Sequence, residues 1–250
     1  MPTTQKPEKD SGFEKDVGMI SGFVAALAIT MALSTGVLAE TPQGAGTQPS
    51  TTAAPAAGAT DDVQGIPPEY MWTNVVTDFD RDRLSRLDEA VALGTEESYG
   101  ASATIRERAA FHKVMDAETK PINDADLLGW WACRTIKVGG KFSGLVVYSW
   151  FDCKVSVRDG FLFFEKRSGS QRLSGRLYQD GSDRRVLLAA PTYNDEPQRA
   201  YSGPEGGITD PQRQDKLGVL SQLVDGRLRV VFPWSVLEST YDVLELKRPN

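Results

Sequence analysis

The chain has 250 residues, of which 40% are hydrophobic and 25% are charged, an ordinary composition for a globular protein of one or two domains. Its formal net charge of −6 gives no overall attraction to polyanions, which argues against a general nucleic-acid binder. His112 is the single histidine, and Cys133 and Cys153 are the two cysteines. Because zinc takes three or four such ligands, we expect no metal site, and we expect no other cofactor.

The N-terminal segment resembles an export signal. Residues 19–39 carry no charged side chain, and three lysines precede them. Val37 and Ala39 are small residues at the two positions that a signal peptidase recognises, so we predict cleavage after Ala39. The same uncharged stretch would span ~30 Å as a helix, so residues 1–39 are interpreted as a signal peptide or an uncleaved membrane anchor. Either interpretation predicts a periplasmic or secreted protein, or one anchored facing the periplasm.

A stretch rich in threonine, alanine and proline follows this segment. Residues 41–60 contain no charged side chain and nothing larger than glutamine to bury. Such a composition cannot compensate for the entropy lost on ordering the backbone. We therefore predict a disordered linker over residues 40–65 and a single globular domain over residues 66–250.

The first helix of the domain is predicted over residues 78–93. Thr77 and Asp80 have the spacing of a capping box, and Gly94 is placed to end the helix. An apolar stripe on one face predicts packing against another element. The stripe consists of Leu84, Leu87 and Val91.

A second helix is predicted over residues 105–117. Thr104 and Glu107 have the capping-box spacing at its start. Its apolar side is expected to consist of Ile105, Ala109 and His112. His112 has two interpretations, a general base or a half-buried packing residue with one hydrogen bond, and we favour the second because no nucleophile is identified beside it.

From residue 129 to residue 247, apolar residues recur with a period of two, and turn sequences recur every 8 to 15 residues. Glycine pairs and Asp-Gly turns indicate hairpins and therefore antiparallel strands. Eight such strands can close into a small barrel, so we expect an α+β fold with an antiparallel eight-stranded β-barrel, and a β-sandwich is the alternative. The predicted strands are residues 130–138, 145–157, 161–166, 172–178, 184–190, 217–224, 227–234 and 241–247.

The second predicted strand alternates clearly between apolar and polar residues. One set of its side chains should therefore face the interior of the barrel. That set is Leu145, Val147, Phe151, Cys153, Val155 and Val157.

The two cysteines lie on neighbouring predicted strands. Their midpoint is Ser143, inside the turn that joins these strands, so we expect Cys133 and Cys153 to lie directly opposite each other. Opposed residues in an antiparallel pair have Cα atoms ~4.5 to 5.5 Å apart, within reach of a disulfide, and an exported protein meets an oxidising compartment. We predict the disulfide, and the alternative is a thiolate nucleophile at one of the two positions.

Common catalytic motifs are absent from the sequence. It contains no GxSxG, HExxH, GxxxxGK[ST] or GxGxxG pattern. A pair of Asp or Glu residues could still support acid and base catalysis, but the sequence does not identify which two carboxylates are close together. We therefore predict no catalytic residue.

Four residues are candidates for ligand binding. Residues 154–185 carry more basic than acidic side chains, with aromatic residues between them, and include Arg172, Arg176 and Tyr178. An RNA-binding sheet uses a similar mixture of residues. The preferred interpretation is a solvated outer face, on which the aliphatic parts of the arginine side chains cover apolar residues. Trp130, which opens the first strand beside a second tryptophan, is interpreted as a ligand contact or as a buried plug at one barrel end.

Several ordered sequence blocks resemble one protein family. They are CRTIKV at 133–138, SWFDCKV at 149–155, DGFLFFEKRSGSQRLSGRLYQDG at 159–181 and FPWSVLESTYDVLEL at 232–246. Together they are similar to the domain-of-unknown-function family 4893, which consists of exported bacterial proteins. The resemblance covers residues 72–246 approximately and implies export and a layout of helices followed by strands. It implies no activity, catalytic residue or cofactor.

The favoured function is a non-enzymatic extracytoplasmic binding or inhibitory β-barrel module. Its partner would be an envelope protein or a small ligand, with no nucleic acid, and membrane contact only through the N-terminal segment. The alternative is an envelope-polymer hydrolase that uses a carboxylate pair, with Arg172 or Arg176 holding an anionic group. The link over residues 191–216 is too long for a plain turn, and loops of this length often serve as lids or binding loops.

Overall fold

The computed structural model of the chain describes residues 67–141, 144–206 and 210–249. All of them belong to one compact unit, Gly58–Asn250. The predicted leader, the cleavage after Ala39 and the linker over residues 40–65 lie outside the described residues. Among the helices in the described ranges, none is both long and apolar enough to cross a membrane.

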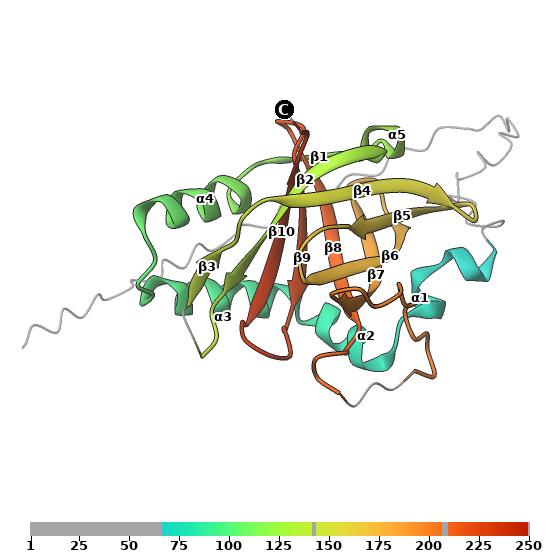
Figure 1. Cartoon of the computed structure of the whole chain (residues 1–250), viewed down its shortest axis with the longest axis horizontal. Helices are drawn as coiled ribbons and strands as arrows, with labels where there is room; N and C mark the ends of the chain where they lie inside the picture. Colours follow the sequence, from blue (N-terminus) through green and yellow to red (C-terminus); the bar gives the residue numbers. More distant parts are fainter. Residues whose placement is uncertain (1–66, 142–143, 207–209, 250) are drawn as a thin grey trace, which may run out of the picture. The chain divides into compact units, whose positions relative to one another are not determined.

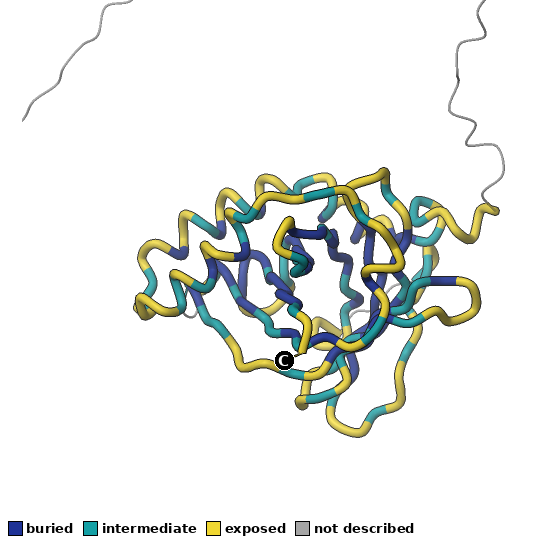
Figure 2. Tube along the Cα trace, turned by 90° about the horizontal axis from the view of Figure 1, so that it is seen from above, coloured by how far each residue is buried: buried dark blue, intermediate teal, exposed yellow. Residues whose placement is uncertain are grey.

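Ten strands form one sheet in this unit. They are β1 (Thr119–Lys120), β2 (Gly129–Val138), β3 (Leu145–Val147), β4 (Phe151–Arg158), β5 (Phe161–Lys166), β6 (Gln171–Asp180), β7 (Arg184–Tyr193), β8 (Lys216–Leu223), β9 (Leu228–Pro233) and β10 (Tyr241–Lys247). Eight of them pair in the order β8-β7-β6-β5-β4-β2-β10-β9, and β9 pairs back onto β8. All of these pairings are antiparallel. Because the last strand of the order, β9, pairs with the first, β8, the sheet closes into an eight-stranded barrel, and the alternative of a β-sandwich is wrong (Figures 1 and 2). The short strands β1 and β3 extend it by pairing with β8 and β2.

The helices lie outside the barrel (Figure 1). They are a 3-10 helix at Pro68–Tyr70 and five α-helices, α1 (Trp72–Val75), α2 (Asp78–Ser85), α3 (Leu87–Tyr99), α4 (Ile105–Met115) and α5 (Asp124–Leu127). Helix α3 contacts β2, β9 and β10, while α4 contacts β3 and α2 contacts β8. The sequence predicted only two helices, and the short helices before residue 78 and after residue 120 were missed because single turns carry almost no periodic signal.

The prediction of one helix over residues 78–93 is wrong, because the backbone of Arg86 leaves the helical region with φ −110° and ψ 26°. Its carbonyl oxygen accepts a hydrogen bond from the indole of Trp234 at 3.1 Å, and its guanidinium lies over the same indole ring. Gly94 does not end the helix either. It lies inside α3, where a Cβ atom would come within 2.6 Å of the Tyr241 ring, so its role is close packing of helix on strand.

The capping box of the second helix is confirmed. The Thr104 hydroxyl accepts a hydrogen bond from the Glu107 backbone amide, and the Glu107 carboxylate accepts one from the Thr104 amide at 2.8 Å. The predicted apolar side of this helix is wrong, since Ile105 is 87% exposed and the buried residues are Phe111 and Val114. Helix α4 therefore packs against the barrel with the face that carries Phe111 and Val114, and not with the face that carries Ile105.

The predicted strand over residues 145–157 is two strands, β3 and β4. Lys137 of β2 pairs with Val146, whereas Cys133 of β2 pairs with Phe151, so one extra residue separates the two registers. Because a shift of one residue reverses the face of every side chain, Leu145 and Val147 pack outside the barrel rather than inside it. The interior prediction is confirmed for Phe151, Cys153 and Val155 and wrong for Val157, which is 62% exposed.

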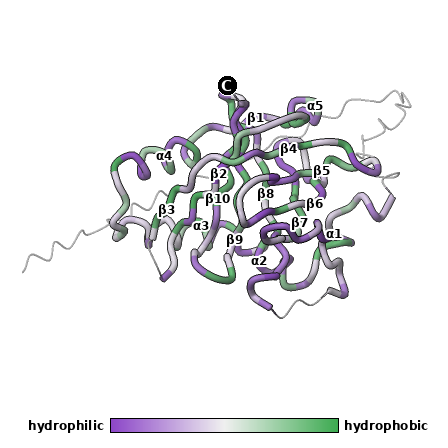
Figure 3. The backbone as a smooth tube through the Cα atoms, in the orientation of Figure 1, coloured by the Kyte–Doolittle hydropathy of each residue, from purple (hydrophilic) through white to green (hydrophobic). Residues whose placement is uncertain are grey.

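Apolar residues pack in three clusters around the barrel wall. Figure 3 shows the hydropathy of each residue along the backbone of these strands and helices. The largest fills the barrel interior and includes Trp131, Phe164 and Leu187. A second lies outside the wall beneath α3 and α4 and includes Phe111 and Tyr241. The third, which contains Val76, Phe161 and Tyr178, lies against the outer face of β5 to β8. The strands that carry both inner and outer clusters are therefore buried on both faces.

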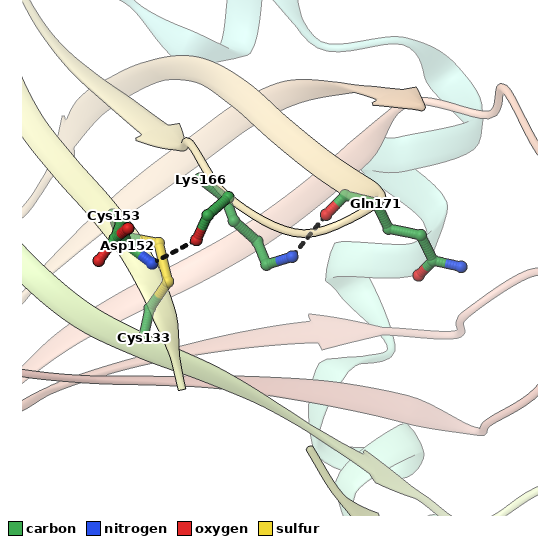
Figure 4. The surroundings of a disulfide bond; sticks show 6 residues. Cys133, Asp152, Cys153, Lys166 and Gln171 are labelled. Carbon is green, nitrogen blue, oxygen red and sulfur yellow. Dashed lines mark hydrogen bonds between the residues drawn. A yellow bond between two sulfur atoms is a disulfide. The ribbon is translucent and has the colours of Figure 1, made fainter. Parts of the chain in front are cut away.

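The structure contains the predicted disulfide between Cys133 and Cys153, with Cα atoms 5.8 Å apart (Figure 4). The expected register is wrong, because Cys153 pairs with Trp131 and Cys133 pairs with Phe151. The cysteines are therefore diagonal neighbours across β2 and β4 rather than directly opposed. The midpoint argument failed because Val138 pairs with Leu145, which places the midpoint of the hairpin before position 143, and one extra residue between β3 and β4 does not make up the difference.

Candidate functional site

The barrel interior is apolar at one end and polar at the other. Along the inner face of β2 the side chains run from Trp131 and Cys133 to Thr135 and Lys137. At the apolar end the Trp131 indole is buried and donates a hydrogen bond of 2.8 Å to the carbonyl of Leu127 in α5. The Trp131 indole therefore fills space at the apolar end, and a cavity lies at the polar end.

A cavity of about 130 Å³ lies at the polar end, which we call the barrel mouth. Three lysines from three strands line it, Lys137 of β2, Lys166 of β5 and Lys216 of β8. Arg172 adds a fourth positive charge, and the carboxylates that line the mouth are Glu238 and Asp242. The lining residues thus carry two positive charges in excess, although the chain as a whole has a net charge of −6. A small anion would be attracted to the barrel mouth.

Two of the three lysines have carboxylate partners. Lys137 pairs with Glu238, and the nitrogen of Lys216 lies 3.8 Å from an oxygen of Asp242. Burial opposes the charge of Lys137, but the hydrogen bond to Glu238 and the charge of Asp242 outweigh it and raise the pKa of this lysine. Burial lowers the pKa of Lys216, with Asp242 acting in the opposite direction.

Lys166 differs from the other two lysines. Its ammonium donates a hydrogen bond of 2.5 Å to the carbonyl of Gln171 (Figure 4). It also lies 4.2 Å from the centre of the Phe151 ring. No ion pair joins it to a carboxylate among the described residues. Burial lowers its pKa, and the charge of Arg172 lowers it further. Lys166 therefore keeps donor capacity that an anion in the barrel mouth could use.

The remaining walls of the barrel mouth combine hydroxyl groups with apolar surface. The hydroxyl oxygen of Ser235 is buried and has no hydrogen-bond partner among the described residues. The apolar part of the wall consists of Leu173, Pro191, Pro211, Phe232, Leu237 and Leu244. A few convergent polar groups above an apolar floor are the usual composition of a small-ligand site.

The sequence candidates on β6 lie on the outside of the barrel. Arg176 and Tyr178 contact Phe161, with the guanidinium 4.1 Å from its ring centre and the tyrosine ring 5.7 Å away. Tyr178 is buried, which raises its pKa. Arg172 lies near the edge of the barrel mouth and forms an ion pair of 3.4 Å with Asp195. These residues share one face of β6, but only Arg172 borders the barrel mouth.

Trp130 is separate from the other three candidates. It lies half exposed on the outer face of β2, with the ammonium of Lys154 and the guanidinium of Arg167 each 5.4 Å from its ring centre. The tryptophan that fills one barrel end is its neighbour, Trp131. The alternation of the strand separates the two side chains, so the structure does not bring Trp130 together with Arg172 or Arg176.

His112 is exposed, not half-buried as predicted, and its one side-chain hydrogen bond joins its Nδ1 to the carboxylate of Asp116 at 3.1 Å. It lines none of the cavities described here. Within the described part of the chain, no group of three or more His, Cys, Asp or Glu residues is arranged to hold a metal ion. The carboxylates that come together in the barrel mouth, Glu238 and Asp242, each face a lysine.

The long link between β7 and β8 is anchored to the helices by buried polar groups. The Tyr201 hydroxyl donates a hydrogen bond of 2.6 Å to Asp80, and Asp215 accepts one of 2.8 Å from the amide of Ser202. Arg83 is buried between them, paired with Asp80 and bonded to the carbonyl of Asp215 at 2.9 Å. The described residues of the link between β7 and β8 are therefore held in a defined position against α2.

The comparison with protein families gives one match. A family model described as Domain of unknown function (DUF4893) matches residues 72–246. The chain belongs to this family. No curated protein and no solved structure matches the chain. The region matched by DUF4893 includes all the lysines of the barrel mouth and both cysteines.

The three mouth lysines were missed by the sequence analysis. Lys137 has the same alternation phase as Cys133, which was expected to face Cys153, so the inner position of Lys137 could have been read from the pattern. Lys166 ends one predicted strand, and Lys216 directly precedes another. The available signal was a lysine near the end of a strand, at a position whose side chain alternates toward the barrel interior. Only closure of the barrel brings the three lysines together.

Proposed function

We propose that this DUF4893 protein is a non-enzymatic extracytoplasmic binding module that holds a small anion in the mouth of its β-barrel. The observation that carries the proposal is Lys166, a half-buried ammonium without a carboxylate partner among the described residues. It lies in a cavity whose lining carries two positive charges in excess. The volume of about 130 Å³ fits a compact anion such as phosphate, sulfate or a short carboxylate.

The physical reason to expect a bound anion is the free-energy cost of burying a positive charge. An ammonium that loses water without gaining a counter-ion destabilises the folded protein, and burial already lowers the pKa of Lys166 and Lys216. An anion bound between them would supply the missing charge and the hydrogen-bond acceptors. Retention of such a group at a cost in stability is typical of a functional site.

Location outside the cytoplasm is part of the proposal. It is supported by the uncharged segment over residues 19–39, preceded by lysines, and by the disulfide between Cys133 and Cys153. Disulfides persist in oxidising compartments and are rare in the cytosol.

The expected leader processing can be tested directly by mass spectrometry of protein expressed with its own N-terminus in a bacterial host. We expect a periplasmic or secreted product that begins at residue 40 and carries the Cys133–Cys153 disulfide. Replacing Ala39 with leucine should leave the protein uncleaved and attached to the membrane fraction, because the peptidase requires a small residue there. Full-length protein in the cytosol with two free thiols would contradict the proposed location.

Anion binding should depend on Lys166. We expect inorganic phosphate, titrated by calorimetry, to bind the native protein and to bind Lys166→Gln at least about 10-fold more weakly, since a charge-assisted hydrogen bond is lost. The matched control is Lys154→Gln, which removes a lysine from the outer face of the neighbouring strand β4. Equal phosphate affinity in native protein and Lys166→Gln would refute binding at the barrel mouth.

The pH dependence of binding follows from the direction of the pKa shifts. Lys166 and Lys216 have pKa values below the ordinary 10.5, so they lose their charge at a lower pH than an exposed lysine. Affinity for sulfate, whose charge is constant above neutral pH, should be greatest near neutrality and fall before pH 10.5 is reached. The same fall should be absent in the double variant Lys166→Gln, Lys216→Gln, which binds weakly at every pH. An affinity that rises with pH would contradict the proposal.

An enzyme and a protein inhibitor are the two other outcomes of these experiments. The hydrolase alternative requires a close pair of carboxylates free to act as acid and base. Glu238 and Asp242 are instead paired with Lys137 and Lys216, so the geometry favours binding. Hydrolysis of an envelope polymer that is lost in Glu238→Gln would favour the enzyme, and specific capture of one envelope protein without any bound anion would favour the inhibitor.

A further inference from the structure

A second cavity, separate from the barrel mouth, lies on the outside of the barrel wall. It has a volume of about 380 Å³ and lies between the outer faces of β5 and β6 and residues 198–201 of the long link. The floor includes Ser174 and Arg176, whose side chains point away from the barrel interior. Because the barrel wall separates it from Lys166 and the mouth, a ligand here would occupy a site of its own.

Residues 198–202 form a strap over this cavity that is fixed on both sides. On one side Gln198 donates a hydrogen bond of 2.7 Å to the buried Glu165 and accepts one of 3.1 Å from Arg158. On the other side the Tyr201 hydroxyl accepts a hydrogen bond of 3.0 Å from the amide of Thr77. The strap is therefore anchored to β4 and β5 at one end and to the start of α2 at the other, which holds the cavity open between them.

The polar groups of the cavity favour an anion. Among its arginines, Arg158 is paired with Glu165 at 3.2 Å and Arg199 with Asp215 at 2.8 Å. Arg176 has no carboxylate ion pair among the described residues, and its guanidinium lies over the ring of Phe161. Beside it on the floor, the hydroxyl of Ser174 is buried, 3% exposed as a residue, and has no hydrogen-bond partner in the part of the chain that the structure describes. A buried hydroxyl without a partner is costly, and an oxyanion held by Arg176 would satisfy it.

The walls of the cavity favour a flat apolar body. Phe163 and Tyr178 line it from the sheet, Tyr201 from the strap and Leu188 from β7. The one acidic side chain of the lining, Asp159, lies exposed in the turn between β4 and β5. A volume of about 380 Å³ falls in the range of small-molecule sites, which are mostly apolar with few polar groups.

We infer that this strap-covered cavity binds an aromatic oxyanion, a ring that carries a carboxylate or a phosphate monoester. The oxyanion contacts the guanidinium of Arg176 and accepts a hydrogen bond from Ser174. The ring lies between Phe163 and the tyrosines. The inference does not depend on anion binding in the barrel mouth, since the two cavities share no lining residue.

The experiment is a titration of the folded, disulfide-bonded protein with phenyl phosphate and, separately, with benzoate, followed by amide NMR signals and by calorimetry. We expect saturable shifts at Gly175 and Ala200, which line the cavity, with the preferred probe identifying the oxyanion. Arg176→Gln should weaken binding at least about 10-fold, and Arg176→Lys should recover only part of it, because a lysine cannot make the paired contacts of a guanidinium. Phenol, which has the ring without the oxyanion, should bind far more weakly.

Two further variants make the result decisive. Arg184→Gln removes an exposed arginine of β7 and should leave binding unchanged. Ser174→Ala keeps the cavity open and should weaken binding several-fold. The inference is overturned if phenyl phosphate and benzoate bind Arg176→Gln as tightly as the native protein, if neither probe binds, or if the shifts occur only at mouth residues such as Thr135.

Discussion

Replacing both Cys133 and Cys153 with alanine is expected to lower the free energy of unfolding by about 3 kcal/mol. The disulfide closes a loop of 20 residues, and the chain-entropy model gives a stabilisation of that size for such a loop. It also joins β2 to β4 directly beside the extra residue that separates β3 from β4. Loss of the bond should therefore loosen the part of the wall that carries Lys137 and Lys166.

The measurement is urea denaturation followed by tryptophan fluorescence. Native protein with the disulfide reduced is the matched control, because both cysteines are fully buried and alanine also leaves a small void. Reduced native protein and the double variant should unfold within about 1 kcal/mol of each other. A loss below about 1 kcal/mol in both would show that the barrel closes without help from the disulfide.

Gly175→Ala is expected to cost about 3 kcal/mol or to prevent folding, near the upper end for overpacking a core. Gly175 faces Ala189 across the pair β6 and β7, and a Cβ atom would come within 2.1 Å of the Leu188 carbonyl oxygen and 2.4 Å of the Ala189 Cα. These are backbone atoms, so the two strands would have to separate. The substituted methyl group has no rotamer by which it could avoid them.

Gly100→Ala is the control for this change. Its backbone has an ordinary negative φ of −77°, and the nearest atom to an added Cβ is 3.9 Å away. Its unfolding free energy should stay within about 0.5 kcal/mol of the native value, as for most surface changes. If Gly175→Ala is equally mild, the close approach of β6 to β7 is not a constraint on the fold.

The two substitutions also bear on binding, because the same strands carry both cavities. Leu173 on the inner face of β6 lines the barrel mouth, while Ser174 and Arg176 on the outer face line the strap-covered cavity. A change in the spacing of β6 and β7 would therefore alter both sites together. Point changes at Lys166 or Arg176 should instead affect one site each.

Local features of the chain were largely predictable. The strands Phe161–Lys166 and Tyr241–Lys247 were placed at their observed bounds, and the capping box at Thr104 and Glu107 was identified correctly. Each of these signals comes from residues close in sequence, such as turn glycines, alternation and side chains that bond nearby amides. The closed antiparallel barrel was also the favoured architecture.

The failures came from contacts between distant residues. The break of the first long helix depends on Trp234, and the burial of Gly94 inside a helix depends on Tyr241, both more than 140 residues away in sequence. The diagonal position of the cysteines follows from the pairing of Val138 with Leu145 and from one extra residue between β3 and β4, which also reverses the inner and outer faces of Leu145 and Val147. Local patterns contain no information about these partners.

By itself, the sequence determined the run of antiparallel strands, the caps and the pairing of the only two cysteines, since these depend on short-range periodicity and on composition. The tertiary structure alone decided which lysines meet in the barrel mouth and that Arg176 has no carboxylate ion pair among the described residues. Closing the barrel brings Lys137, Lys166 and Lys216 together from strands far apart in the chain. The electrostatic potential in a cavity depends on the distances between charged side chains, and the order of charged residues along the chain does not specify these distances.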